Sequence, residues 1–434
     1  MTGFEHKLLG KVLGEHGYIR GPFGSALVRS ELKDQGVPVY EQQHAIRGDR
    51  EFRFFVGKEK FKELSRFQVR PDDLIVSCSG TIGRISIIQP GDPLGIISQA
   101  LLILRPQTDE VLPQFLYYFL STYEGQQALI QASHGSVQVN IAPRAVVEQI
   151  ETPVPTIPEQ RAIIYILGSL DEKIELNRRM NVTLEESARA LFKSWFVDFD
   201  PVRAKMEGRQ PEGIDVETAA LFPDRLVESM LGFIPDGWRV GTLGEIASNP
   251  RRSVQPKQML EGTLYIGLEH MPQRSISLSD WGAATDVESN KYQFFTGELL
   301  FGKLRPYFHK VGIAPIDGIC STDVLVITPV ADYWWGTVLM LISSVEFVNE
   351  TTLLSGGTRM PRVNWSDMAH YKIVIPMPNV AQMFSEFVEQ VGKLIIRNIH
   401  QWHLLVVTRD ALLPKLLSGE VRVGQLNVGE YNYE

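Results

Sequence analysis

The sequence has few cysteines, no long apolar run and no leader-like beginning. Cys78 and Cys320 are its only cysteines in 434 residues, and their separation fits neither a disulfide framework nor a zinc site. No apolar stretch reaches the roughly 18 residues of a membrane span. The N-terminal residues are interrupted by Glu5, His6 and Lys7 and lack the apolar core of a secretion signal. These absences predict a cytoplasmic protein that does not associate with a membrane.

What the sequence does contain is an internal duplication, with the two copies shifted by about 222 residues. The matching blocks are 68–75 (QVRPDDLI) with 293–300 (QFFTGELL), 95–106 (GIISQALLILRP) with 318–329 (GICSTDVLVITP), and 115–122 (FLYYFLST) with 337–344 (TVLMLISS). A glycine-led loop ahead of a Pro-x-Pro element also recurs, at 135–155 and 357–378. Each half is therefore predicted to form one globular unit followed by one helix.

A heptad pattern closes each copy. In the first copy, apolar and occasional polar residues recur at alternating spacings of three and four, which predicts a long helix with a buried a/d seam. Its members are Ile163, Leu167, Leu170, Ile174, Asn177, Asn181, Leu184, Ala188, Leu191 and Trp195. The second copy repeats the phase with Phe384, Val388, Val391, Ile395, Asn398, Trp402, Leu405, Arg409 and Leu412.

The two seams suggest that the helices pack against each other. If the duplicated halves are related by an approximate twofold axis, the packing is antiparallel. Asn177 and Asn398 occupy matching positions and are expected to fix the register, as buried polar residues do in coiled coils. Asn181 and Arg409 also interrupt the apolar seam, and local exposure of an imperfect helix is the alternative explanation for all of these polar residues.

The globular units combine short strands with helices. Residues 73–77, 85–88 and 101–104 are β-branched or apolar runs, and 298–301 and 324–328 are their counterparts in the second half. An aromatic or apolar helical stretch follows in each half. The length suits two domains of about 150 residues with connectors. The predicted fold class is α+β: two similar mixed α/β domains separated by two long antiparallel coiled-coil helices, in a pseudo-twofold repeat.

The net charge of −8 is unevenly distributed. Much of the acid lies in the connector after the first helix, whereas basic residues cluster at 47–62, 251–257 and 303–310. Any contact with phosphate must therefore come from local patches. A solvated surface is an equally good interpretation of each basic cluster.

Two similar globular units on a helical spacer can contact two separated parts of one duplex. A helix of about 33 residues is about 50 Å long, and one turn of DNA advances by about 34 to 36 Å. Because the units differ in sequence, they need not read the same bases. The small residues at 79–83 would allow close approach to a phosphate, although from the glycines alone a tight turn between two strands is the better explanation.

Two long motifs resemble the specificity subunit of type I restriction-modification systems. They are residues 153–201, PVPTIPEQRAIIYILGSLDEKIELNRRMNVTLEESARALFKSWFVDFDP, and residues 233–248, FIPDGWRVGTLGEIAS. The turn at 79–84 is also similar to the SGxIGR-like turn of that family's target recognition domains. The second copy departs from this turn, with Gly302-Lys303-Leu304-Arg305-Pro306 in its place.

The resemblance implies two target recognition domains, each reading one half of a bipartite double-stranded DNA site. It implies that the helices dock two modification (methyltransferase) subunits, which methylate adenine with S-adenosylmethionine, and that restriction subunits join for cleavage. S-adenosylmethionine, ATP and Mg would belong to those partners. The expected organisation is 1–155 first target recognition domain, 156–200 first spacer helix, 201–234 acidic connector, 235–378 second target recognition domain, 379–418 second spacer helix and 419–434 C-terminal tail.

The candidate site residues are polar or basic side chains on loops and helices. Those expected near DNA are Ser79, Thr81, Arg84, Gln138, Asn140, Lys303, Arg305, Thr358, Arg359 and Arg362. Those expected to contact partner subunits are Asn177, Arg178, Glu185, Arg397 and Asn398. Lys and Arg would position the DNA backbone, whereas side chains that reach base edges would supply specificity.

Catalytic motifs are missing. The nearest approach to the Asp/Asn-Pro-Pro-Tyr/Phe motif of adenine methyltransferases is at 249–251 (NPR), and no GxxxxGK[ST] loop occurs. Asp72, Asp73 and Arg84 could be read as a nuclease cluster, but a strand-entry turn explains them better. For His400 and His403, packing or exposure is a better explanation than a metal site. The sequence predicts a chain that is not an enzyme and holds no metal or cofactor.

The alternative function is a stand-alone DNA-binding regulator, or a coiled-coil scaffold, without an enzymatic partner. A scaffold does not need two differing globular units, and a typical dimeric repressor would use identical ones. The target sequence cannot be read from the residues, because recognition also depends on loop geometry and on DNA deformation.

Overall fold

The computed structural model describes residues 4–130, 141, 143–285, 288–357 and 359–423. The chain divides into two compact units: unit 1 comprises Met1–Glu172 with Val406–Glu434, and unit 2 comprises Lys173–Leu405. Two 40-residue helices, α7 (Ile157–Phe196) and α14 (Pro378–Leu417), each contribute one stretch to each unit. The long heptad helices predicted from the sequence are confirmed.

Unit 1 contains the first globular part. Its helices and strands are β1 (Glu5–Leu8), α1 (Leu9–Leu13), β2 (Tyr18–Arg20), β3 (Val37–Tyr40), α2 (Gln42–Arg47), β4 (Phe55–Val56), α3 (Lys58–Glu63), β5 (Leu74–Ser77), β6 (Ile85–Ile87), β7 (Ile96–Ile97), β8 (Leu101–Leu104), α4 (Pro113–Ser121), α5 (Tyr123–Ile130), α6 (Arg144–Val147) and β9 (Glu151–Val154).

Unit 2 contains the second globular part. Its helices and strands are α8 (Asp200–Met206), α9 (Val216–Ala220), β10 (Leu226–Ser229), β11 (Gly232–Pro235), β12 (Arg239–Thr242), α10 (Leu243–Ile246), β13 (Ala247–Ser248), β14 (Ser253–Val254), β15 (Leu264–Ile266), β16 (Gly282–Ala283), β17 (Lys291–Phe294), β18 (Leu299–Gly302), β19 (Val311–Ile313), β20 (Gly318–Cys320), β21 (Val324–Pro329), α11 (Trp335–Ile342), α12 (Val345–Leu354), α13 (Trp365–Ala369) and β22 (Lys372–Ile375).

The two globular parts repeat the same topology. Unit 1 has a four-stranded sheet in the order β2-β8-β5-β6, and unit 2 has the equivalent order β13-β21-β18-β19. A second sheet holds one parallel pair in each unit, β3 with β7 and β15 with β20. A two-stranded antiparallel pair, β1 with β9 and β12 with β22, joins the beginning and end of each globular part. The predicted internal repeat and the α+β class are confirmed.

The central strands form where the sequence has short runs of apolar residues. All four residues of β5, β8 and β18 are buried, because helices cover one face of each four-stranded sheet while the other face meets the second sheet. Strands buried on both faces are expected to read as continuous rather than alternating apolar runs. The strands predicted at 73–77, 85–88, 101–104, 298–301 and 324–328 are found within two residues of those bounds.

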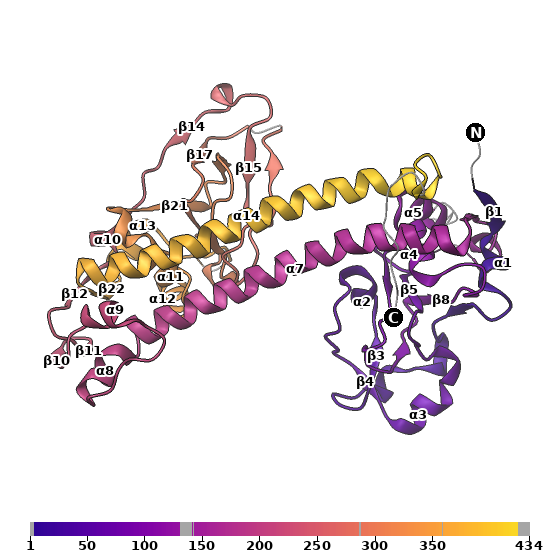
Figure 1. Cartoon of the computed structure of the whole chain (residues 1–434), viewed down its shortest axis with the longest axis horizontal. Coiled ribbons are helices and arrows are strands. Elements are labelled where there is room, and N and C mark those ends of the chain that lie inside the picture. Colours follow the sequence, from indigo (N-terminus) through magenta and orange to yellow (C-terminus); the bar gives the residue numbers. More distant parts are fainter. Residues whose placement is uncertain (1–3, 131–140, 142, 286–287, 358, 424–434) are drawn as a thin grey trace. The chain divides into compact units, whose positions relative to one another are not determined.

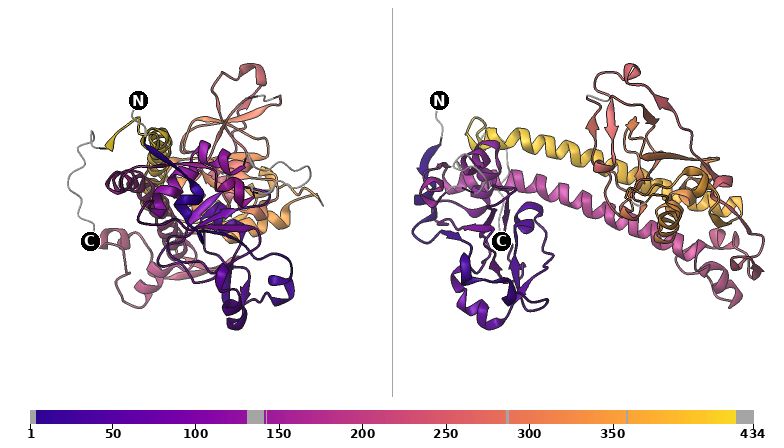
Figure 2. Two further views of the ribbon diagram at one scale, coloured as in Figure 1. Left: turned by 90° about the vertical axis from the view of Figure 1, so that its right-hand side faces the viewer. Right: turned by 180° about the vertical axis from the view of Figure 1, so that it is seen from behind.

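Within unit 2, α7 and α14 run side by side and antiparallel (Figures 1 and 2). Asn177 donates to Gln401 (3.3 Å), Asn398 donates to Asn181 (2.9 Å), and the ring of Phe192 lies 6.0 Å from that of Phe384. As the residue number rises along α7, its partner's number falls along α14. The predicted antiparallel coiled coil is therefore confirmed.

Asn177 and Asn398, the polar residues expected to fix the register, are both buried and both form hydrogen bonds between the helices. Asn177 and Asn398, which match by duplication, do not contact each other: Asn398 pairs with Asn181, and Asn177 pairs with Gln401. The reason is that an antiparallel pairing brings duplicate positions together only where the twofold axis passes between them. The seam residues are buried or half-buried throughout, including Asn177, Asn181 and Asn398.

Within unit 1, the other stretches of the long helices also pair. Arg409 of α14 donates to Asp171 of α7 (2.8 Å), and the same carboxylate accepts the hydroxyl of Tyr118 from α4 (2.8 Å). Ile163 and Leu167 of α7 belong to the same apolar core as residues of the final turns of α14. Arg409, an exception in the predicted apolar seam, is thus accounted for by an ion pair.

The acidic connector expected at 201–234 is folded. It forms α8, α9 and the hairpin of β10 with β11. Val202 and Phe222 are 0 % and 2 % exposed and join the core of unit 2 beside Trp195 and Trp238. A few apolar residues within an acidic stretch suffice to fasten it to the core.

Across the described ranges, no single helix is long and apolar enough to cross a membrane. Among the described residues, one pair of helical segments, Asp332–Ile342 and Val345–Leu354, bent by 72°, passes such a test of length and composition together. Most of the large apolar residues of that pair are buried in the core of unit 2.

Candidate nucleic-acid interface

In the first globular part, three candidate residues lie on the hairpin loop that joins β5 to β6. The loop closes on Ser77: its amide donates to the Arg84 carbonyl (2.8 Å), its carbonyl accepts from the Gly83 amide (2.9 Å), and its hydroxyl accepts from the Arg84 amide (2.9 Å). The side chains of Thr81 and Arg84 are exposed, and Ser79 is half-buried. The hairpin therefore presents polar side chains at its tip on a closed backbone.

Two features hold this loop in shape. Gly80 and Gly83 have φ of +65° and +72°, a conformation that side chains with a Cβ rarely adopt. The side-chain amide of Gln42, at the start of α2, donates to the carbonyls of Ser79 and Thr81. Residues 79–83 thus form a tight turn between β5 and β6, as one interpretation of the sequence expected. This turn leaves the polar tip of the hairpin accessible.

In the second globular part, four candidate residues gather around the equivalent hairpin, between β18 and β19. The Arg305 amide donates to the Pro361 carbonyl (2.7 Å), and its guanidinium lies 3.4 Å from the Arg359 carbonyl. An isolated bridge joins Leu304 to Arg362. The structure therefore brings Lys303 and Arg305 of the hairpin together with Arg359 and Arg362 of the later loop.

Within this group, the four basic side chains have different surroundings. Arg362 forms a two-pronged ion pair with Asp323, with Nε and a terminal nitrogen 2.8 and 3.1 Å from the carboxylate oxygens. The ion pair with Asp323 holds the later loop in position and uses two of the three guanidinium nitrogens of Arg362. Arg305 is half-buried in a left-handed conformation (φ +50°), and its Nε is buried without an acceptor in the described part of the chain. Unlike Arg362, Arg305 forms no ion pair among the described residues, so no neighbouring carboxylate offsets its charge.

The two hairpins are closed in the same way. The Ile141 amide donates to the Cys78 carbonyl (2.9 Å) in unit 1, and the Val363 amide donates to the Lys303 carbonyl (3.1 Å) in unit 2. Each bond ties the residue after the central strand to the end of the later loop. The candidate residues Gln138, Asn140 and Thr358 belong to those loops and lie outside the described residues.

The carboxylates of Asp72 and Asp73 have structural roles. Asp73 is fully buried and forms a two-pronged ion pair with Arg105 (2.6 and 2.7 Å). Its counterpart Glu298 is held in the same manner by Arg252 (2.8 and 2.6 Å). Asp72 accepts from Gln114. The strand-entry explanation of Asp72 and Asp73 is confirmed.

Metal-binding and thiol chemistry find no support in the described ranges. No group of three or more His, Cys, Asp or Glu residues there could hold a metal ion. His400 and His403 instead contact the carbonyls of Pro315 (2.9 Å) and Ser279 (2.8 Å), which confirms packing. Burial raises the pKa of Cys78 to about 12 and that of Cys320 to about 12, which disfavours the reactive thiolate.

Several residues of the basic clusters are already paired with acids. Arg50 contacts Asp92 (2.7 Å), and Lys60 contacts both Glu31 (3.0 Å) and Glu63 (2.9 Å). Arg252 is committed to Glu298, as described above. These ion pairs offset part of the positive charge of the first two clusters, and leave the group around Arg305 as the best basic candidate.

Four of the five residues expected to contact partners make contacts within the chain. Asn177 and Asn398 make the interhelical contacts described above, and Glu185 is buried against the second globular part. Arg178 is exposed and lies over the ring of Trp402, 4.0 Å from its centroid. Arg397 is also exposed. The sequence pattern did not separate inward from outward polar residues on these helices.

Sequence reasoning also missed residues that shape the hairpins. Asp323 holds the later loop through its ion pair with Arg362. Gln42 holds the first hairpin loop through the carbonyls of Ser79 and Thr81. His309 holds the second hairpin loop through the Ser343 carbonyl. Asp323 lies just before the repeated apolar run of β21, and this position next to a repeated block was the one feature of the sequence that could have pointed to it. Gln42 and His309 gave none, because their partners are distant in the sequence.

Two related globular parts that present equivalent hairpins with different side chains define a two-headed recognition protein. Residues 24–186 match the family model described as type I restriction modification DNA specificity domain. This model covers the first globular part and the beginning of α7, and similarity to proteins named type I restriction enzyme specificity subunits extends over most of the chain.

Two curated relatives and one solved structure are similar to the chain over most of its length. The chain is 25% identical over 400 residues to the type I restriction enzyme MjaIX specificity subunit of Methanocaldococcus jannaschii, covering 89% of this chain and 85% of the relative. It is 27% identical over 387 residues to the HindI specificity subunit of Haemophilus influenzae, covering 75% and 81%. The crystal structure of the type I S subunit from M. genitalium has the same fold, with a TM-score of 0.57, 14% identity and coverage of 95% and 96%.

Proposed function

We propose that this chain is the DNA-specificity subunit of a type I restriction-modification complex, in which each globular part reads one part of a bipartite target. The observation that carries the proposal is the pair of equivalent hairpins, β5–β6 and β18–β19, on sheets of the same topology. Their tips differ in sequence, so they can read different bases. The subunit recognises DNA and leaves catalysis to its partners.

The hairpin side chains supply two kinds of contact. Arg84 and Arg305 are suited to phosphate oxygens or to a guanine edge, and Ser79 and Thr81 offer hydroxyls that bond to either. Gln138, Asn140, Lys303, Thr358, Arg359 and Arg362 complete the proposed DNA-contacting set. Because the side chains that read bases sit on loops held by a rigid sheet, the loops can vary while the scaffold is kept.

The partners supply the chemistry. The proposed complex contains two modification subunits that methylate adenine with S-adenosylmethionine, and restriction subunits that use ATP and Mg. The exposed faces of α7 and α14, which include Arg178 and Arg397, are the proposed docking surfaces, whereas Asn177, Glu185 and Asn398 support them from within. This complex would act in the cytoplasm.

A methylation map tests the function. The chain is co-expressed with its modification subunit, and methylated adenines are located across the genome by single-molecule sequencing. A single split motif with a fixed spacer, lost when the chain is deleted, is the expected result. Exchange of residues 239–375 for those of another specificity subunit should change one half of the motif only, because β12 and β22 close that part of the fold. A stable complex without chain-dependent methylation would instead support a stand-alone regulator.

A further inference from the structure

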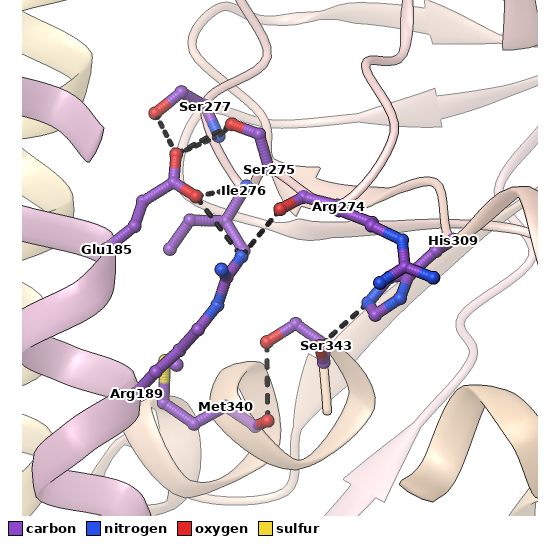
Figure 3. A network of polar contacts seen from close by, with 9 residues as sticks. All are labelled: Glu185, Arg189, Arg274, Ser275, Ile276, Ser277, His309, Met340 and Ser343. Carbon is purple, nitrogen blue, oxygen red and sulfur yellow. Dashed lines mark hydrogen bonds and ion pairs between the residues drawn. The ribbon is translucent and has the colours of Figure 1, made fainter. Parts of the chain in front are cut away.

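Glu185 lies on α7 but faces the second globular part (Figure 3). It is 4 % exposed. One carboxylate oxygen accepts from the Ser275 hydroxyl (2.7 Å), the Ser277 hydroxyl (2.6 Å) and the Ser277 amide (3.1 Å). The other accepts from the Ile276 amide (3.1 Å) and from Arg189 (3.3 Å). Hydrogen bonds to an ionised acceptor are among the stronger ones, so this set fixes loop 274–277 on the helix.

The same loop is joined to strand β19. Ser277 forms a parallel bridge with Ile313, and the Ile313 amide donates to the Ile276 carbonyl (3.0 Å). Strand β19 is the second strand of the hairpin that presents Lys303 and Arg305. A displacement of loop 274–277 would therefore be transmitted to that hairpin through backbone hydrogen bonds.

A second path begins one helical turn later. Arg189 donates to the Arg274 carbonyl (2.8 Å), and the Arg274 amide donates to the His309 carbonyl (2.8 Å). His309 lies inside the β18–β19 loop, and its Nε2 contacts the Ser343 carbonyl at 2.8 Å (Figure 3). Arg274 and His309 both have positive φ, +59° and +52°. Residues that adopt this conformation are held there by their surroundings.

We infer that Glu185 and Arg189 are positioning residues: they set the placement of the β18–β19 hairpin on α7 and thereby the reading of the second part of the DNA target. This inference rests on the proposed function. It also reassigns Glu185, which the sequence suggested as a contact for a partner subunit. The carboxylate is directed into the chain, where its acceptor sites are occupied.

The contacts made by Glu185 and Arg189 are specific to the second globular part. Under the duplication, the positions about 221 residues beyond Glu185 and Arg189 are Val406 and Asp410, which cannot reproduce the carboxylate acceptor and guanidinium donor. Loss of Glu185 should therefore affect one half of the recognised motif. A positional effect of this kind differs from general destabilisation, which would reduce recognition of both halves.

The experiment compares motifs directed by variant chains in the full complex with the modification subunits. Glu185→Gln removes the charge and replaces one accepting oxygen with a donating nitrogen, at a site where the Ile276 amide, the Ser277 amide and Arg189 are all donors. Glu186→Gln, at the exposed neighbouring position, is the matched control. We expect Glu185→Gln to lower discrimination at the second half of the motif by about tenfold, the effect of losing one or two charge-assisted hydrogen bonds. Discrimination at the first half, and the motif of the control, should not change.

A gentler variant covers the case in which Glu185→Gln folds poorly. Ser275→Ala with Ser277→Ala removes only the two hydroxyl donors, and we expect a smaller loss confined to the same half. Unchanged motifs in both variants, or an equal loss of methylation at every site with an unaltered motif, would overturn the positioning role. If the unmodified chain directs no methylation at all, the proposed function fails first and the inference fails with it.

Discussion

The side-chain amide of Asn398 donates a hydrogen bond to the side-chain oxygen of Asn181 at 2.9 Å, and both residues are almost fully buried between α7 and α14. The Asn181 amide lies 3.4 Å from the Ile395 carbonyl. A buried pair of amides satisfies its hydrogen bonds in one register only. Sliding either helix by one turn would separate these two amides, so the pair favours this alignment.

Replacement of one member of this pair should destabilise the chain more than replacement of both. Asn398→Leu leaves the buried side-chain oxygen of Asn181 without its donor and should lower the free energy of unfolding by about 2 kcal/mol. The double variant with Asn181→Leu should recover most of this loss. Urea denaturation followed by circular dichroism measures the difference, with Arg397→Gln as an exposed control. Additive losses in the double variant would contradict the pairing.

Arg305 should contribute to DNA affinity through its charge and its planar donors. Arg305→Ala should weaken DNA binding by the assembled complex about tenfold. If the contact is to phosphate, the salt dependence of the affinity should also show about one fewer counterion released on binding. Arg305→Lys should restore the salt dependence without full affinity. Fluorescence anisotropy at several salt concentrations is the measurement. Arg239→Ala, in an exposed ion pair with Glu245, is the control, and an equal loss in that variant would argue against a specific role.

The buried ion pair of Asp73 and Arg105 should be costly to break. Arg105→Ala leaves a fully buried carboxylate without its partner and should lower the free energy of unfolding by about 3 to 5 kcal/mol. Arg179→Ala removes the exposed pair with Glu175 and should change it by less than about 1 kcal/mol. Similar melting temperatures for the two variants would show that Asp73 is not dependent on Arg105.

Stability should depend on pH through His309. Burial, with Arg274 and Arg189 nearby, lowers the pKa of this imidazole below 6.5. The unfolded chain therefore takes up a proton at a higher pH than the folded chain. The stability associated with this site is fully present above about pH 6.5 and falls as the pH drops towards the folded pKa. His309→Asn, which tolerates positive φ, should flatten that part of a urea-midpoint profile, and an identical slope in both proteins would refute the assignment.

Both cysteines should be unreactive in the folded chain. Burial raises the pKa values of Cys78 and Cys320 to about 12, and neither thiol is exposed. At about pH 8 the reactive thiolate is therefore scarce and shielded. A thiol-specific chromogenic reagent should react with neither cysteine until denaturant is added, and then with both. Rapid labelling of the native protein would show that one of the cores opens readily.

The sequence predicted the architecture because periodicity and repetition are local properties. The seam from Ile163 to Trp195 and its copy from Phe384 specified two long amphipathic helices, and short apolar runs located the central strands. The duplication specified two equivalent globular parts. None of this required knowledge of which distant residues meet.

The polar residues show where that reasoning stops. Arg305 and Arg362 are equally basic in the sequence, but in the folded chain Arg362 is paired with Asp323, whereas Arg305 forms no ion pair among the described residues. Asp73 became structural because the fold places Arg105 beside it.

The sequence by itself therefore determined that the protein has two heads on paired helices, since apolar burial follows the spacing of residues along the chain. The tertiary structure decided which polar groups face each other across that framework. Glu185 is the clearest case, because a carboxylate on a heptad helix can face a partner or its own chain, and only the position of loop 274–277 directs it inward. Hydrogen bonds and ion pairs act over a few ångströms between residues far apart in sequence, and no local pattern encodes that proximity.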